Sequence, residues 1–433
     1  APQYSLRKGL KLFGKEGKEA AMSELTQLHH METYYPVHVH ELTRQQRIDA
    51  LSSLIFLIQK QDWKVKGHTC MNGSKQRGWI SKESAASPTV ATESITITAA
   101  IKAYKLRRDI MLDIPGAFLH AKLDKDVIML LKGKLAEMMV LVDLKLYRPY
   151  VIMTSKGEKL LYLRMKKTMY GLLRSALLFY LRLVKDLKEF GFELNPYDPC
   201  VANKTVKGTQ MTVTWHVDDL KVSHKSGVEL TKLLRFLGKK YGNRITVKRG
   251  LVHDYLGMDF DYSEPGAVQI LIIKHLKKVF DDFPDEVGKS ASTPASDHLF
   301  QVRDPEEVER LGKFLPKEQA THFHHTVVQL LFISIRVQRD IQTAMSFLTT
   351  HVKKPDEDDW GKLKRVLKYL KGTMHMKLKL SVENMGMVQW WVDASYNAHE
   401  DCRGQTGAMM SLGKGAVVSK STKQKLNVRS SSE

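Results

Sequence analysis

One stretch, residues 211–222, restricts the fold more than any other because a regular alternation continues on both sides of two adjacent acids. Apolar residues occupy every second position from Met211 to Val217, with Thr and His between them. Such alternation predicts a strand with one buried face. The alternation resumes after Asp218 and Asp219. Strand, two turn-prone residues and strand together predict a β-hairpin with an aspartate pair at its tip.

The aspartate pair raises a question of charge. Neighbouring side chains of a flat strand point to opposite faces, so Asp218 and Asp219 can serve one site only at a turn. A third acid, Asp113, ends another strand-like segment, which Pro115 and Gly116 terminate. Two such strands side by side would bring three carboxylates together, a donor set that suits Mg²⁺ with substrate phosphates. A solvated acidic turn is the alternative for an isolated Asp-Asp pair.

The overall charge points to a polyanion. The 68 Lys and Arg residues against 47 Asp and Glu leave a net charge of +21, which favours nucleic acid as a partner. A membrane surface is a weaker alternative, because no basic amphipathic helix with an aromatic face is present and no apolar run approaches the ~20 residues of a membrane span. The three cysteines, Cys70, Cys200 and Cys402, are too far apart for a zinc knuckle. They suit a reducing compartment and so favour an intracellular protein over a secreted one.

The rest of the pattern is mixed. Apolar steps of three and four from Leu172 to Leu187 predict a helix, which Gly191 is placed to end. Residues 50–59 are predicted to be buried, as a helix or a strand. The other predicted elements are helices over 18–28, 93–108 and most of 301–385, a loop over 72–88, and a strand-rich unit from 386. The first residues lack an initiator Met and a signal-peptide core, as at a fragment end.

An ordered set of motifs resembles one protein family. "LDIPGAFLHAKL", "MYGLLRSALLFY", "GFELNPYDPCV", "WHVDDL" and "YLGMDF" are similar to the reverse transcriptases of Ty1/copia-type retrotransposons. "FHHTVVQLLFISIRVQRDIQTAM" with "WGKLKRVLKYLKGT" resembles that family's connection region, and "VDASYNA" to the final "SSSE" resembles the front half of its ribonuclease H domain. The resemblance covers roughly residue 20 to the end. It implies an α+β fold: a right-hand polymerase of fingers, palm and thumb, then a helical connection and a truncated ribonuclease H-like α/β unit.

The resemblance also implies domains and an activity. It implies an RNA-directed DNA polymerase that adds deoxynucleotides to a primer 3′-hydroxyl, using two Mg²⁺ ions or Mn²⁺ in their place. Its partners would be an RNA template, a DNA primer, the RNA–DNA hybrid and deoxynucleoside triphosphates, with the oligomeric state left open. The protein would be soluble and lie in a cytoplasmic particle or the nucleus. The implied units are the reverse transcriptase over 1–300, with its palm at about 85–125 and 195–265, the connection over 301–385, and the partial ribonuclease H-like domain over 386–433.

Matching the motifs residue by residue gives candidate roles. Asp113, Asp218 and Asp219 would be the catalytic, metal-binding carboxylates. Phe118 would lie under the incoming sugar and exclude a 2′-hydroxyl by steric clash, although a core aromatic is the alternative. Residues 255–257 match the segment that grips the primer.

The nucleotide-binding side is expected to come from two further segments. Tyr170 and Gly171 match the turn beside the nucleotide and the template base, where glycine permits close backbone approach; an ordinary glycine at a helix start is the alternative. Lys64, Lys66 and His68 stand where the family has a basic stretch that contacts the triphosphate. A neutral His68 would hold the triphosphate less well than arginine.

The sequence also departs from the family pattern. His216 stands where the family usually has Tyr, and residues 173–174 are Leu-Arg where Lys-Gln is usual. Asp393 and Glu433 match the first two of four ribonuclease H carboxylates, so this part is expected to be incomplete and inactive. Two alternatives are kept: a decayed or repurposed protein that binds nucleic acid without turnover, and a DNA-templated polymerase, which the ordered motifs disfavour.

Overall fold

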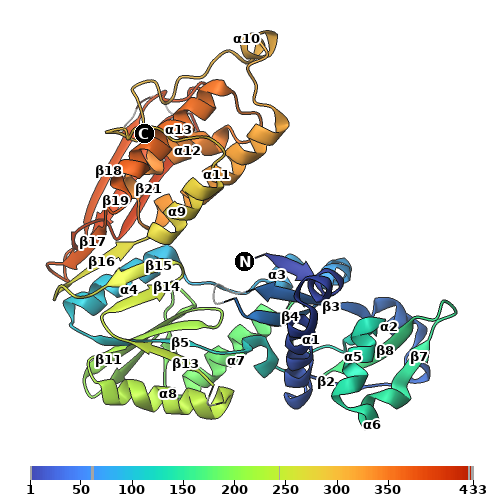
Figure 1. Cartoon of the computed structure of the whole chain (residues 1–433). Helices are drawn as coiled ribbons and strands as arrows, with labels where there is room; N and C mark the ends of the chain where they lie inside the picture. The colour runs from blue at the N-terminus through green and yellow to red at the C-terminus, as the bar shows by residue number, and fades with distance from the viewer. Residues whose placement is uncertain (1, 60–62, 243, 428–429, 431–433) are drawn as a thin grey trace.

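The computed structural model describes residues 2–59, 63–242, 244–427 and 430. The protein is a mixed α/β chain with four sheets. Figure 1 shows the N-terminal elements at the right, the middle of the chain at the lower left around α8, and the C-terminal elements above. Among the described residues, no helix has the length and apolar character needed to cross a membrane.

The N-terminal part is built on a seven-stranded sheet with the order β1-β3-β6-β8-β2, to which β4 and β7 are attached through β3 and β8. Helix α1 packs on β3 and β4, and α5 packs on β8. The buried core includes Leu25, Leu57 and Leu163, which are fully covered. The elements are β1 (Gln3–Ser5), α1 (Leu6–His30), β2 (Tyr34–Pro36), α2 (Arg44–Asp49), β3 (Leu51–Gln59), β4 (Val65–Met71), β6 (Ile128–Lys132), α5 (Lys134–Val142), α6 (Leu144–Tyr147), β7 (Val151–Met153) and β8 (Lys159–Met165).

The middle of the chain forms a six-stranded antiparallel sheet with the order β13-β5-β12-β11-β10-β9. Helix α8 packs on β12 and β5, and α4 contacts β11. Val213 and Val222 are completely buried in the core of this sheet. The elements are α4 (Thr92–Tyr104), β5 (Arg108–Asp113), α7 (Ser175–Glu189), β9 (Glu193–Leu194), β10 (Val201–Val206), β11 (Thr209–His216), β12 (Asp219–His224), α8 (Gly227–Tyr241) and β13 (Thr246–Arg249).

The C-terminal part contains two smaller sheets and a helical layer. A five-stranded sheet has the order β14-β15-β16-β17-β20, and a three-stranded sheet has the order β18-β19-β21. Because β17 and β20 share one sheet, the chain pairs across the expected boundary at residue 386. The elements are β14 (Val252–Tyr255), β15 (Met258–Asp261), β16 (Ala267–Leu271), α9 (Ile273–Asp282), α10 (Pro305–Arg310), α11 (Lys317–Arg336), α12 (Gln342–Thr350), α13 (Glu357–Thr373), β17 (Leu378–Val382), β18 (Gln389–Ser395), β19 (Gln405–Ser411), β20 (Gly413–Lys414) and β21 (Val418–Lys423).

Most predicted elements are present, and the differences have physical causes. The segment 50–59, left open above, is strand β3. The predicted loop 72–88 contains a 3₁₀ turn (Gly73–Gly78) and the short helix α3 (Lys82–Ala85). The prediction of one buried face for β11 was wrong: Thr212 and Thr214 are 5% and 2% exposed, because α4 covers the side of the sheet opposite α8.

Candidate active site

The acids Asp113 and Asp219 lie directly opposite each other on neighbouring strands. Strands β5 and β12 are antiparallel, and their register pairs Asp219 with Asp113. The N–H of Ile114 donates to the carbonyl oxygen of Asp218 at 3.2 Å, the bond that flanks a non-hydrogen-bonded pair. In such pairs the two Cα atoms are roughly 4.5 Å apart and the side chains lie on one face. Two carboxylates distant in sequence therefore share one position at the end of the sheet.

The hairpin tip places the third acid, and the turn lies one residue earlier than predicted. His216 pairs with Asp219, so the turn residues are Val217 and Asp218, and Asp219 belongs to β12. Val217 has φ 57°, a left-handed conformation that is strained for a β-branched residue. Strained backbone of this kind is concentrated at functional sites, where the surrounding structure holds it in place. The strain here releases Asp218 from the strand alternation.

The acids at the tip influence one another electrostatically. The pKa of Asp218 is raised, first by burial and then by the charge of Asp113. The pKa of Asp219 is raised by burial, then by Asp218 and Asp113. A backbone hydrogen bond at Asp218 and the nearby His216 imidazole act in the opposite direction, and no lysine or arginine of the described residues contributes. Uncompensated carboxylates of this kind favour a bound cation.

The oxygen donors suit Mg²⁺, which takes one or two carboxylates and completes its shell with water and substrate phosphates. Within the described ranges, however, no three His, Cys, Asp or Glu side chains are gathered as a finished metal site. The cavity directly against Asp113 and Asp219 is small, at about 80 Å³. A metal would therefore depend on substrate oxygens for part of its coordination.

A group of aromatic rings borders the acids. The Tyr170 ring lies 4.6 Å from that of Phe118 and 4.5 Å from that of His68, in edge-to-face contacts. Burial, followed by the charges of Asp218 and Asp113, raises the pKa of Tyr170 to about 12. The structure thus brings Phe118, Tyr170 and His68 to the same site as the carboxylates, from three separate segments.

Gly171 joins this site to strand β4. It has φ +91°, and a Cβ built there would lie 2.0 Å from the carbonyl oxygen of Met71. The N–H of Met71 in turn donates to the carbonyl oxygen of Tyr170 at 2.8 Å. Only glycine allows this approach, so the close contact is with the protein's own strand.

The remaining predicted residues lie in different parts of the structure. Lys64 and Lys66 are exposed at the start of β4, and Lys66 acts on His68, whose pKa is lowered first by burial. The Tyr255 hydroxyl donates to the carbonyl oxygen of Asp219 at 3.4 Å. Asp393 lies on β18 in a different sheet. Glu433 lies outside the described residues.

Sequence reasoning missed a buried polar group behind the acids. Asp109 accepts from His253 at 2.8 Å and pairs with Lys102 at 3.1 Å. Lys221, two residues after Asp219, donates to the Tyr262 hydroxyl at 2.8 Å, and burial lowers its pKa to about 7. These contacts tie the six-stranded sheet to β14–β16. No sequence motif marks them, because each residue is isolated in the chain.

Known proteins resemble the chain in this same region. The family model described as reverse transcriptase (RNA-dependent DNA polymerase) matches residues 54–296, more than half of the chain. A transposon Ty5-1 protein of Saccharomyces cerevisiae is 26% identical over 258 residues, which are 59% of this chain and 80% of the relative.

Two plant relatives are longer. The retrovirus-related Pol polyprotein from transposon TNT 1-94 of Nicotiana tabacum is 23% identical over 375 residues, which are 86% of this chain and 26% of the relative. The corresponding polyprotein from transposon RE2 of Arabidopsis thaliana is 23% identical over 374 residues, 86% of this chain and 23% of the relative. The chain therefore spans about a quarter of these two polyproteins.

Proposed function

Because the chain belongs to the reverse transcriptase (RNA-dependent DNA polymerase) family of Ty1/copia-type retrotransposons, we propose that it copies an RNA template into DNA. The observation that carries this proposal is the pairing of Asp113 with Asp219 across neighbouring strands, beside a strained tip that bears Asp218. The six-stranded sheet would be the palm, the seven-stranded sheet the fingers, and the elements from β14 onward the thumb, the connection and a partial ribonuclease H-like unit.

In the proposed reaction the primer 3′-hydroxyl oxygen attacks the α-phosphorus of a deoxynucleoside triphosphate. A P–O bond forms to the primer, the hydroxyl proton passes to solvent, the bond between the α-phosphorus and the bridging oxygen of the β-phosphate breaks, and pyrophosphate leaves. Asp113 and Asp218 would hold two Mg²⁺ ions, or Mn²⁺, with Asp219 in support. The ions, when bound, supply positive charge to the phosphates and acidify the attacking hydroxyl.

Other side chains would position and select the substrates. The Phe118 ring, held against Tyr170, would occupy the space of a ribose 2′-hydroxyl and so favour deoxynucleotides. Lys64 and Lys66 would contact the triphosphate. The surplus of basic residues would hold the template–primer duplex through its phosphates, independently of sequence.

A primer-extension assay on poly(rA)/oligo(dT) with Mg²⁺ tests the proposal. We expect extension by the wild-type protein and a loss of more than about 10³-fold in Asp218→Asn, as for removal of a central catalytic group. Asp281→Asn, at an exposed position of α9, makes the same chemical change away from the site and should keep full extension.

Each of the other outcomes supports a different function for the protein. Extension that survives Asp218→Asn contradicts the assignment of the site. Tight, salt-sensitive binding of the duplex without extension indicates a nucleic-acid-binding protein without turnover. Extension on a DNA template without extension on an RNA template indicates a DNA-templated polymerase.

A further inference from the structure

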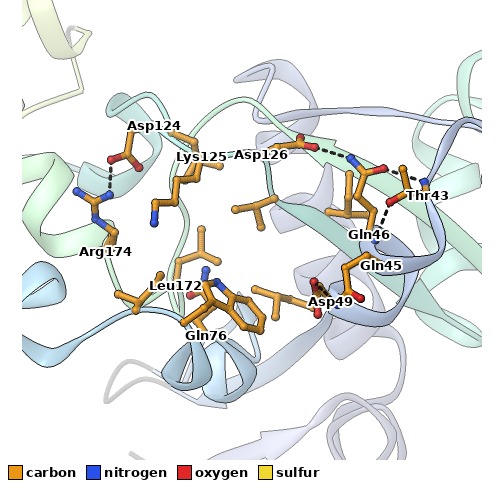
Figure 2. A pocket seen from close by; sticks show the side chains of 16 residues that line it. Thr43, Gln45, Gln46, Asp49, Gln76, Asp124, Lys125, Asp126, Leu172 and Arg174 are labelled. Atoms are coloured by element: carbon orange, nitrogen blue, oxygen red, sulfur yellow. Dashed lines mark hydrogen bonds and ion pairs between the residues drawn. The ribbon is translucent and has the colours of Figure 1, made fainter.

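A separate pocket of about 400 Å³ lies behind the segment that contains Tyr170 and Gly171. Leu172 and Arg174 line it (Figure 2), whereas Tyr170, two residues earlier, responds to the charges of Asp218 and Asp113. One short segment, residues 170–174, therefore reaches both the pocket and the surroundings of the acids. The volume is in the range of sites that hold one small organic ligand.

The pocket offers a flat ring and an apolar floor. Trp79 lines it and is 48% exposed, so a large part of its side chain is open to contact. The floor comes from aliphatic side chains of four different segments: Leu51, Ile80, Val127, Ile128 and Leu172. A planar, partly apolar ligand would gain from contact with the indole ring and with this floor.

A buried amide gives the pocket a polar group without a partner. Gln76 is 4% exposed and lines the pocket. Its Oε1 accepts from the N–H of Leu173 at 2.9 Å, which fixes the orientation of the amide. Its Nε2 group donates to no described residue. A ligand that presents an acceptor, such as a ring nitrogen or a carbonyl oxygen, would satisfy this donor.

The charges of the pocket leave one cation available. Arg174 pairs with Asp124, Gln46 donates to Asp126 at 2.8 Å, and Gln45 donates to Asp49 at 2.9 Å. Figure 2 marks these interactions of the three acids and marks no hydrogen bond or ion pair of Lys125 with the other residues drawn. Lys125 also has no ion pair among the described residues. Its ammonium can therefore meet an anionic group of the ligand.

We propose that this pocket binds one unpaired nucleotide. Its base lies against Trp79, an acceptor on the base edge receives the Gln76 amide, and its phosphate meets Lys125. The proposal rests on the proposed function, in which a template strand passes the acids whose charges act on Tyr170, two residues before the pocket-lining Leu172. The same chemistry would also fit a free nucleotide.

Fluorescence binding to template–primers tests the proposal without any catalytic step. Two duplexes are compared in the absence of triphosphates: one is blunt, and the other has a template overhang that contains 2-aminopurine. We expect the wild-type protein to prefer the overhang and Trp79→Ala to lose about 5- to 150-fold of that preference, the range for one base–aromatic stack. Trp390→Ala, which removes a Trp of similar exposure (57%), should leave it unchanged.

Three further experiments identify the ligand and its source. An abasic nucleotide at the overhang position should remove the preference in the wild-type protein. Lys125→Gln should reduce the salt dependence of overhang binding by about 0.7 in log–log slope, while Lys145→Gln should not. Adenosine monophosphate that binds alone, competes with the overhang and depends on Trp79 would identify free nucleotide as the source.

Two results would overturn the proposal: an overhang preference that Trp79→Ala leaves intact, or an equal loss of binding to blunt and overhang duplexes. Because only binding is measured, the two proposals fail separately. Overhang binding that depends on Trp79, without primer extension, would contradict the polymerase assignment and support the pocket. Primer extension without Trp79-dependent overhang binding would contradict the pocket alone.

Discussion

Two antiparallel sheets of this protein each carry an aspartate, yet only one of them builds a site around it. In the six-stranded sheet, Asp113 and Asp219 end neighbouring strands and face each other. In the C-terminal three-stranded sheet, Asp393 lies on β18 opposite Gly407. The first pair shares its position with a third acid at the hairpin tip, whereas the partner of Asp393 has no side chain. A strand can present a carboxylate, but neighbouring strands must supply the rest of the site.

Burial differs between the two sheets as much as charge does. Trp215 on β11 is 1% exposed, while Trp390 and Val392 on β18 are 57% and 68% exposed. Among the described strands, β18 has one neighbour, β19, along one edge. Both strands are rich in apolar residues, so composition does not decide which strand is covered. Helices on both faces and strands on both edges make β11 a core strand.

The largest expected effect is on protein stability and compares the buried Trp215 with the exposed Trp390. Trp215→Ala should destabilise the protein by about 3–5 kcal/mol, because it removes a fully packed ring and leaves a cavity. Trp390→Ala should change stability by less than about 0.5 kcal/mol, as for other exposed positions. Urea denaturation followed by circular dichroism measures both variants. A loss at Trp390 as large as that at Trp215 would show that β18 is covered in solution.

The six-stranded sheet also shows what sequence can and cannot predict. Alternation predicted the hairpin, because side-chain direction in a strand depends only on local periodicity. It misplaced the turn, since a left-handed Val217 is not expected from local preferences. The burial of Thr214 and the partners of Lys221 depend on elements distant in the chain. Local patterns therefore predicted the elements, and tertiary packing decided the burial and the polar contacts.

The pocket behind residues 170–174 was missed for a related reason. Its lining is contributed by segments near residues 43–51, 76–80, 123–128 and 172–174. None of these segments carries a recognisable motif for a ligand. The acids, in contrast, lie in short motifs that resemble a known family. Sequence therefore located the site with a shared motif and not the one assembled from ordinary residues.

A smaller effect is expected from the protonation of Asp218 as the pH changes. Burial raises the pKa of Asp218, and so does Asp113. In the metal-free protein this carboxyl therefore binds a proton at a pH above the usual aspartate range. Between the unfolded and folded pKa values the folded state binds more protons, so lowering the pH stabilises this site. Asp218→Asn should thus be more stable than wild type at neutral pH.

The gap in stability between Asp218→Asn and wild type should shrink as the pH falls through the raised pKa. Thermal unfolding of both proteins across a pH series measures this gap. Asp281→Asn, made on the exposed face of α9, should show no such gap. A stabilising effect of Asp218→Asn that grows toward acid pH would contradict the raised pKa.

The smallest expected effect concerns Asp393. Asp393→Asn should leave primer extension, thermal stability and the integrity of an RNA–DNA hybrid unchanged, because β18 is exposed and its aspartate has no acidic neighbour across the strand pair. A labelled RNA strand in a hybrid duplex, followed on a gel, measures cleavage by both proteins. Two-metal cleavage needs several carboxylates around the scissile phosphate. Cleavage by the wild-type chain that Asp393→Asn abolishes would mean that further ligands reach β18, and the contrast between the two sheets would then be one of degree.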